Sequence, residues 1–166
     1  LVVLRPCSAV GAIYTPIDPQ WPEARRKHIK TITNAAAIFT ENTSHVTEAK
    51  APLGVTFLER VDDPFNAPSY CFFTSGSTGE PKGALIAHMG MMNHLHSKAH
   101  LLHLGADSVV AQTAATTFDV SIWQFCSALL VGGAVRIVPN GISQDRHALF
   151  PFLHEKQLTQ NELVAP

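Results

Sequence analysis

The chain has 166 residues, which is enough for one domain with a hydrophobic core. Hydrophobic residues make up 46% of it and charged residues 15%, a balance that argues against a disordered segment. The formal net charge is -1, so there is no basic excess that would favour nucleic acid as a partner. The longest uncharged runs, which include residues 120–135, are too short and too polar to span a membrane, so we expect no membrane partner.

The cysteines give a second constraint. Three are present, far apart in the sequence: Cys7, Cys71 and Cys126. Their odd number and the lack of CxxC spacing argue against a disulfide framework and against a zinc site. Because reduced thiols are typical of the cytosol, we expect a cytoplasmic protein.

The first third of the chain predicts short strands around one helix. Residues 12–15 are strand-like, and Pro22 is suited to the first position of a helix that continues to Ile32. Apolar residues at 36–40 and 55–58 predict two more strands, separated by a polar surface loop.

The remainder alternates between strand and helix patterns. Strands are predicted at 70–74, 84–87, 109–112 and 134–138, and helices at about 89–104 and at 119–130. In the second of these helices, Val120, Trp123 and Leu130 share one face.

A last helix is predicted near the end of the chain. Ser143 is expected to cap it, and Pro151 is expected to kink it or to mark its true start. The alternation as a whole predicts an α/β fold with mixed, largely parallel sheets flanked by helices.

The stretch with the most chemical information is FTSGSTGEPKG, residues 73–83. Its glycines let the backbone turn sharply and approach a ligand closely, and successive backbone N–H groups can then bind an anion. The stretch also holds four hydroxyl side chains, at 74, 75, 77 and 78, and ends near Lys82. Hydroxyl and ammonium groups donate hydrogen bonds to phosphate, so this loop is a candidate phosphate clamp.

Other glycine-rich loops fit less well. A P-loop would need a glycine where Pro81 stands and Ser or Thr where Gly83 stands, and it would open a helix rather than a strand. No Rossmann GxGxxG motif is found here. A flexible linker is disfavoured by the flanking apolar strands and by the Pro–Lys pair.

The loop resembles the signature phosphate loop of the adenylate-forming (AMP-binding) superfamily. Two further segments resemble the adenylation domains of nonribosomal peptide synthetases: GAIYTPIDPQWPEAR, residues 11–25, and TTFDVSIWQF, residues 116–125. All three segments occur in the family's order. The resemblance implies that residues 1–166 are part of the large N-terminal subdomain, cut at both ends, without the small C-terminal subdomain.

The resemblance implies a role for each motif. The loop and its lysine would hold the ATP triphosphate and the departing pyrophosphate, and these residues are Thr74, Ser75, Gly76, Ser77, Thr78, Gly79 and Lys82. Asp119 would pair with the substrate's α-ammonium group, and Val120 and Trp123 would line the side-chain pocket. Phe118 would lie beside the carboxylate and the α-phosphate, and together with Lys82 it would be catalytic.

The implied reaction is the ATP-dependent activation of an amino acid as aminoacyl-AMP. The acyl group would then pass to the phosphopantetheine thiol of a peptidyl carrier domain, with a condensation domain in the same synthetase. Mg²⁺ would assist, with its ligands mostly outside these residues. We expect the 166 residues alone to be inactive.

Several alternatives stay open. Asp119 is also suited to be a plain helix N-cap, and Trp123 to be a core residue. An acyl- or aryl-CoA ligase, or a nucleotide-binding piece without catalysis, would share the phosphate loop. His96, His100 and His103 have the spacing of one helix face, but no HExxH motif or nearby carboxylate completes a metal site.

Overall fold

The computed structural model describes Cys7 and residues 11–35, 37–38, 48–49, 63, 65–75 and 80–155. The chain divides into two compact units, Leu1–Met89 and Gly90–Pro166. The strand predicted at 55–58, parts of the one at 36–40, and loop residues 76–79 lie outside the described residues.

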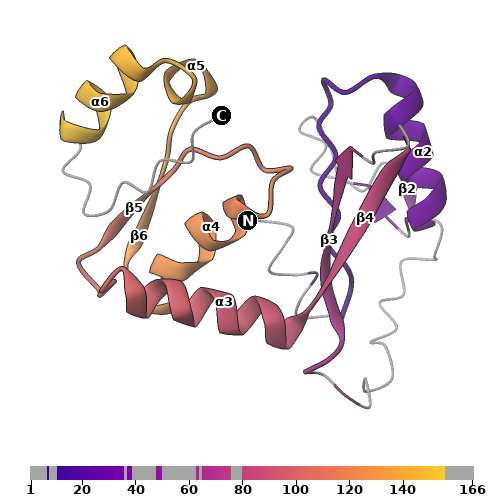
Figure 1. Ribbon diagram of the computed structural model, residues 1–166, viewed down its shortest axis with the longest axis horizontal. Helices are drawn as coiled ribbons and strands as arrows, with labels where there is room; N and C mark the ends of the chain where they lie inside the picture. The colour runs from indigo at the N-terminus through magenta and orange to yellow at the C-terminus, as the bar shows by residue number, and fades with distance from the viewer. Residues whose placement is uncertain are drawn as a thin grey trace. The chain divides into compact units, whose positions relative to one another are not determined.

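In the first unit, the described elements before α3 (His88–Leu101) are the helix α2 and two antiparallel strand pairs (Figure 1). Its elements are α2 (Glu23–Thr33), β1 (Ala37–Ile38), β2 (Glu48–Ala49), β3 (Pro68–Ser75) and β4 (Pro81–Ala87). The pairs are β1 with β2 and β3 with β4.

Helix α2 agrees with the prediction except at its first residue. Pro22 has φ -49° and ψ 140°, so it is the N-cap, and the helix begins at Glu23. The helix ends at Thr33, and the C-cap residue Asn34 adopts the left-handed conformation with φ 45°. Ile29 is fully buried on this helix. It belongs to one apolar cluster with Cys71 and Phe73 of β3, so the helix packs against the strand that leads into the glycine-rich loop.

The strand predicted at 12–15 is reduced to a single bridge. Tyr14 pairs with Tyr70 in parallel orientation. The Tyr14 N–H donates to the Ser69 carbonyl at 3.0 Å, and the Cys71 N–H donates to the Tyr14 carbonyl at 2.9 Å. Two bonds are enough to hold this segment beside β3, but the pairing does not extend further.

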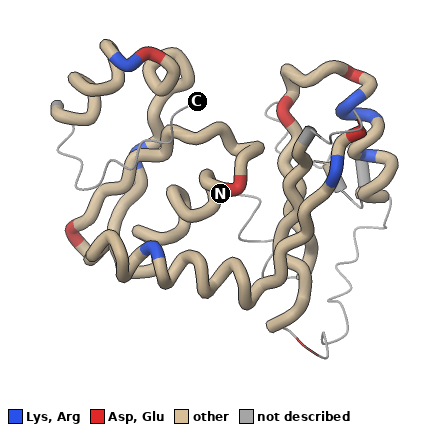
Figure 2. Tube along the Cα trace, viewed as in Figure 1, with Lys and Arg blue, Asp and Glu red and all other residues tan. Residues whose placement is uncertain are grey.

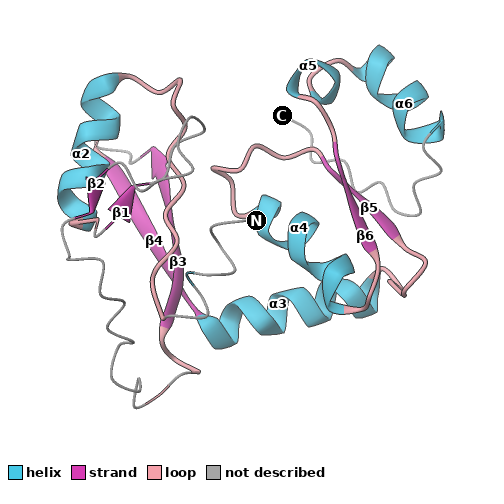
Figure 3. Cartoon of the chain, turned by 180° about the vertical axis from the view of Figure 1, so that it is seen from behind, coloured by secondary structure: helices cyan, strands magenta, loops and turns pink. Residues whose placement is uncertain are grey.

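The second unit contains a parallel pair joined through a helix (Figure 3). Its elements are most of α3 (His88–Leu101), then β5 (Val109–Gln112), α4 (Val120–Leu130), β6 (Ala134–Ile137), α5 (Asn140–Ser143) and α6 (Arg146–Glu155). β5 and β6 pair in parallel from Val109 with Ala134 to Gln112 with Ile137. Helix α4 is therefore the crossover that parallel neighbours require.

The prediction of an α/β chain is confirmed, but the prediction of largely parallel sheets is wrong for the described strands. Two of their three pairs are antiparallel. The physical reason is the length of the connection between β3 and β4. A loop from Ser75 to Pro81 can join antiparallel strands, whereas parallel strands need a crossover of a dozen or more residues.

Two details of the C-terminal helices also differ from expectation. Ser143 is the last residue of α5 and caps nothing further on; instead, Asp145 caps α6, because its carboxylate accepts from the His147 N–H at 2.9 Å. Pro151 lies inside α6 and does not start it. On α4, Trp123 is buried, but Leu130 is 43% exposed, so the predicted shared face does not reach the last turn.

Two findings bear on partners. Within the described ranges, no helix has the length and apolar character needed to cross a lipid bilayer. Acidic and basic positions both occur in each unit of the described trace (Figure 2), in keeping with the near-neutral net charge.

Candidate functional site

The β3–β4 hairpin fixes both ends of the predicted phosphate loop. Thr74 pairs with Lys82, and Ser75 pairs with Pro81 at the end of the ladder. Because directly opposed residues point to the same face of a sheet, the Thr74 hydroxyl and the Lys82 ammonium lie on one side. Both side chains are exposed. The pair therefore offers two hydrogen-bond donors, one of them charged, where the chain enters and leaves the loop.

Strand β3 changes from buried to exposed just before the loop. Its residues from Ser69 to Phe73 are buried on both faces, whereas Thr74 is exposed. On one face the Tyr70 and Phe72 rings meet edge to face, with centroids 5.2 Å apart. On the other face Phe73 and Cys71 pack against Ile29 of α2. A buried, well-packed strand thus carries the first polar residue of the candidate site.

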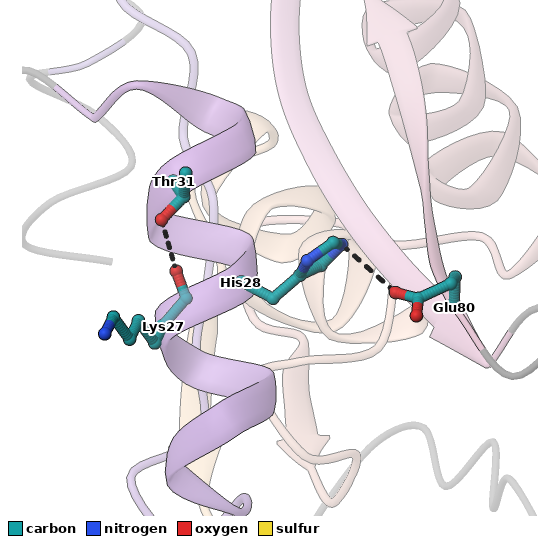
Figure 4. A network of polar contacts seen from close by, with 4 residues as sticks. All are labelled: Lys27, His28, Thr31 and Glu80. Carbon is teal, nitrogen blue, oxygen red and sulfur yellow. Dashed lines mark hydrogen bonds and ion pairs between the residues drawn. The ribbon is translucent and has the colours of Figure 1, made fainter.

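A second contact links α2 to the far end of the loop (Figure 4). The Nε2 atom of His28 lies 3.5 Å from Oε2 of Glu80, two residues before Lys82. Figure 4 shows the imidazole leaving the helix toward this carboxylate, whereas Thr31 bonds back to the Lys27 carbonyl of its own helix at 2.9 Å. The His28 and Glu80 side chains are 40% and 75% exposed, so the pair contributes about 1 kcal/mol or less. Sequence reasoning missed it, because nothing in the pattern places His28 near residue 80.

The predicted amino-acid site lies on the second unit, at the start of α4. Asp119 is the N-cap residue of this helix, and its Oδ1 accepts from the Val120 N–H at 2.8 Å. The side chain of an N-cap normally accepts from the N–H of the second or third helical residue. The backbone of the N-cap itself is normally extended. Asp119 instead has helical angles, φ -58° and ψ -32°. The contact uses one of about four lone-pair sites on the carboxylate, which is exposed and can accept further donors.

The neighbours of Asp119 differ in exposure. Phe118 is 64% exposed, and its carbonyl accepts from both the N–H and the hydroxyl of Ser121, at 3.0 and 2.6 Å. Val120 is half-buried. Trp123 is only 3% exposed, and the Lys98 ammonium lies 5.0 Å from its ring centroid. Within its unit Trp123 therefore packs as a core residue, and its role in a substrate pocket stays a prediction.

A buried glutamine, Gln124, also belongs to this region, and sequence reasoning did not single it out. The side chain is fully buried, and its Oε1 accepts from the N–H groups of Thr113 and Ala114 at 3.1 and 2.9 Å. Its Nε2 donates to the Thr113 hydroxyl at 3.2 Å. The only signal in the sequence was one polar residue between apolar ones in the 119–130 helix. Helical periodicity places such a residue on the solvent-facing side.

The predicted residues thus divide between the units. The phosphate-loop residues belong to Leu1–Met89, and Phe118, Asp119, Val120 and Trp123 belong to Gly90–Pro166. Helix α3 ends at Leu101, so His103 lies beyond it and the predicted shared helix face includes only His96 and His100. His96, His100 and His103 are exposed, and the last two rings have centroids 6.5 Å apart. In the part of the chain that the structure describes, no three His, Cys, Asp or Glu residues gather closely enough to hold a metal ion.

Comparison with known proteins gives a consistent result. The family model for "AMP-binding enzyme" matches residues 1–164. Among curated proteins, the chain is 34% identical over 164 residues to the hybrid PKS-NRPS synthetase lepA of Aspergillus flavus, covering 91% of this chain and 4% of that protein.

Solved structures give the same picture. The chain is similar to a four-domain nonribosomal peptide synthetase, holo-AB3403, solved with AMP and glycine, with a TM-score of 0.72 and 29% identity over 93% of this chain and 12% of that one. It is also similar to the N-terminal subdomain of Klebsiella oxytoca NpsA, with a TM-score of 0.71 and 22% identity over 95% of this chain and 41% of that one. At that identity the likeness concerns the fold alone. The chain spans less than half of the length of each of these proteins.

Proposed function

Because the chain belongs to the family of AMP-binding enzymes, we propose that the full-length protein activates an amino acid as aminoacyl-AMP in nonribosomal peptide synthesis. A carboxylate oxygen of the amino acid bonds to the α-phosphorus of ATP, and the bond from that phosphorus to the β-phosphate bridge breaks. Pyrophosphate leaves. The thiol of a phosphopantetheine on a carrier domain then attacks the acyl carbon and expels AMP, and a condensation domain uses the product.

The observation that carries the proposal is the Thr74–Lys82 pair beside the glycine-rich loop. The departing pyrophosphate accumulates negative charge, so fixed donors near it stabilise the transition state. The Lys82 ammonium supplies a positive charge, and the Thr74 hydroxyl supplies a neutral donor on the same face of the hairpin. We propose that loop residues Ser75, Gly76, Ser77, Thr78 and Gly79 complete this clamp.

We assign the amino-acid end of the substrate to the start of α4. The exposed carboxylate of Asp119 would pair with the α-ammonium group, and the exposed ring of Phe118 would shield the reacting carboxylate from water. Val120 would border the side chain of the substrate, and Trp123 would support this border from the core. The role of these residues is to orient a weak nucleophile, which lowers the barrier by positioning.

The described residues supply no gathered set of carboxylates or histidines for Mg²⁺, and we propose that its ligands lie mostly outside residues 1–166. They do supply donors for phosphate oxygens, which fits ATP. Phosphopantetheine is carried by the partner domain and enters only in the transfer step.

The proposal is tested by amino-acid-dependent ATP–pyrophosphate exchange in the full-length protein, over a panel of the twenty standard amino acids with aryl and fatty acids added. Exchange driven by an amino acid supports the proposal. Exchange driven only by an aryl or fatty acid would favour an acyl- or aryl-CoA ligase. ATP binding without any exchange would favour a non-catalytic nucleotide-binding protein, and either of these two outcomes contradicts the proposal.

A further inference from the structure

The segment between β5 and α4, residues 113–119, is held at its first residues by one side chain. Gln124, fully buried on α4, accepts from the N–H groups of Thr113 and Ala114 and donates to the Thr113 hydroxyl. These bonds bridge 10 or 11 residues of sequence. The buried Gln112 adds a bond from its Nε2 to the Ala114 carbonyl.

The other end of the segment is held by the first turn of α4. The Ser121 hydroxyl and N–H both donate to the Phe118 carbonyl, and the Phe118 N–H donates to the Ala115 carbonyl at 3.0 Å. Gln124 and Ser121 are both buried, whereas Phe118 and Asp119 are exposed. The buried polar residues thus fix the backbone from which the two exposed side chains project.

We propose that Gln124 is a positioning residue for the amino-acid site. It touches the loop and not the substrate, and it acts by holding residues 113–119 so that Phe118 and Asp119 are presented from a fixed backbone. This inference rests on the proposed function, because it concerns the same site. It gives a role to a residue that lies inside the 116–125 segment but to which the resemblance assigned none.

The chemistry of the contact explains why an amide suits this position. Two main-chain N–H groups converge on one oxygen, so the side chain must be an acceptor, and its NH₂ group must find an acceptor of its own. The Thr113 hydroxyl meets that need. An apolar side chain of the same length would leave the N–H groups of the half-buried Thr113 and Ala114 without this acceptor, and the loop would move to reach water.

The experiment compares three variants of the full-length protein. Gln124→Met keeps the length of the side chain and removes its hydrogen bonds. Gln124→Glu keeps the oxygen on which the two N–H groups converge and replaces the NH₂ group with a second oxygen. That oxygen can accept from the Thr113 hydroxyl, or donate to it when the carboxyl is protonated. The matched control is Ser127→Ala, on the same helix and equally buried, because the Ser127 hydroxyl has no hydrogen-bond partner among the described residues.

Two readouts separate positioning from general damage. The first is the KM for the amino acid that gives the fastest exchange in the unaltered protein, compared with the KM for ATP. The second is hydrogen–deuterium exchange of residues 113–119. We expect Gln124→Met to raise the amino-acid KM about tenfold or more, to leave the ATP KM within about twofold, and to speed deuterium uptake in the loop. Gln124→Glu should show a much smaller rise in the amino-acid KM than Gln124→Met. Ser127→Ala should match the unaltered protein in both KM values and in deuterium uptake.

The outcomes are decisive in both directions. An unchanged amino-acid KM in folded Gln124→Met, or equal rises in both KM values, would overturn the inference. If Gln124→Met does not fold, Thr113→Val removes one bond to Gln124, and unchanged loop uptake and KM in that variant would overturn it as well. If the unaltered protein gives no amino-acid-dependent exchange, the proposed function fails instead, and deuterium uptake still reports on the Gln124 clamp.

Discussion

Gly83 lies opposite Phe73 in the β3–β4 pair, and the Phe73 ring fills the space that a side chain at position 83 would need. A Cβ atom on Gly83 would lie 3.1 Å from two atoms of this ring and 2.9 Å from the Cys71 sulfur. The glycine next to Lys82 is therefore needed for packing. The absence of a side chain at Gly83 leaves room for the Phe73 ring, which packs in one cluster with Ile29 of α2.

We expect Gly83→Ala to destabilise the protein by about 1–3 kcal/mol, because an added methyl group must displace a packed ring and a sulfur atom. The measurement is the melting temperature of the full-length protein. Gly141→Ala is the control, since nothing lies within 4 Å of a Cβ there. In helix α5 that change should be neutral or stabilising by about 0.5–1 kcal/mol. Equal melting temperatures for the two variants would contradict the packing role of Gly83.

The hairpin also shows how far the sequence predicted the fold. The strands 70–74 and 84–87 were expected, and both are present, but β4 begins earlier, at Pro81, so Lys82 lies in a strand and not in a loop. Local preferences of Pro and Gly oppose a strand at 81–83. Pairing with the buried strand β3 outweighs them, and this is a tertiary effect that no local window contains.

The second unit was predicted more closely. Strand β5 has the expected bounds, and α4 differs by one residue, because apolar periodicity and burial agree there. The burial of Gln124 was not predicted, because polarity and burial disagree at this position. Its polarity indicated solvent, whereas its partners are main-chain groups ten or eleven residues away, and only the folded loop brings them within reach.

Lys82 tests the phosphate end of the site. Replacing it with methionine removes the charge from an exposed position in β4, so packing should change little. We expect ATP–pyrophosphate exchange to fall about 10²–10³-fold, because a group that stabilises developing charge is lost. Lys82→Arg should retain part of the activity. Lys27→Met, at an exposed position on α2, is the matched control and should leave exchange unchanged. Full activity in Lys82→Met would remove the lysine from the site.

The thiols predict a pH dependence of stability. Burial raises the pKa of both Cys71 and Cys126. The stability that this contributes is fully present below the unfolded pKa, near 8.5, and is lost as pH rises through the folded pKa. A buried thiol with a raised pKa stays protonated, and only the thiolate reacts with iodoacetamide. Iodoacetamide should therefore label both cysteines more slowly in the folded protein than in urea, and faster as pH rises. An engineered cysteine at exposed Ser97 should show no such protection. Equal labelling rates at all three positions would contradict this prediction.

Asp119 distinguishes substrate binding from helix capping. If it pairs with the α-ammonium group, Asp119→Ala should raise the amino-acid KM about a hundredfold, because the ammonium loses its charged partner. The ATP KM should change little. Asp145→Ala is the control, since the Asp145 carboxylate caps α6 through the His147 N–H. That variant should lose about 1 kcal/mol of stability and keep its amino-acid KM. If Asp119→Ala behaves in the same way as Asp145→Ala, Asp119 is a cap and the ammonium must be bound elsewhere.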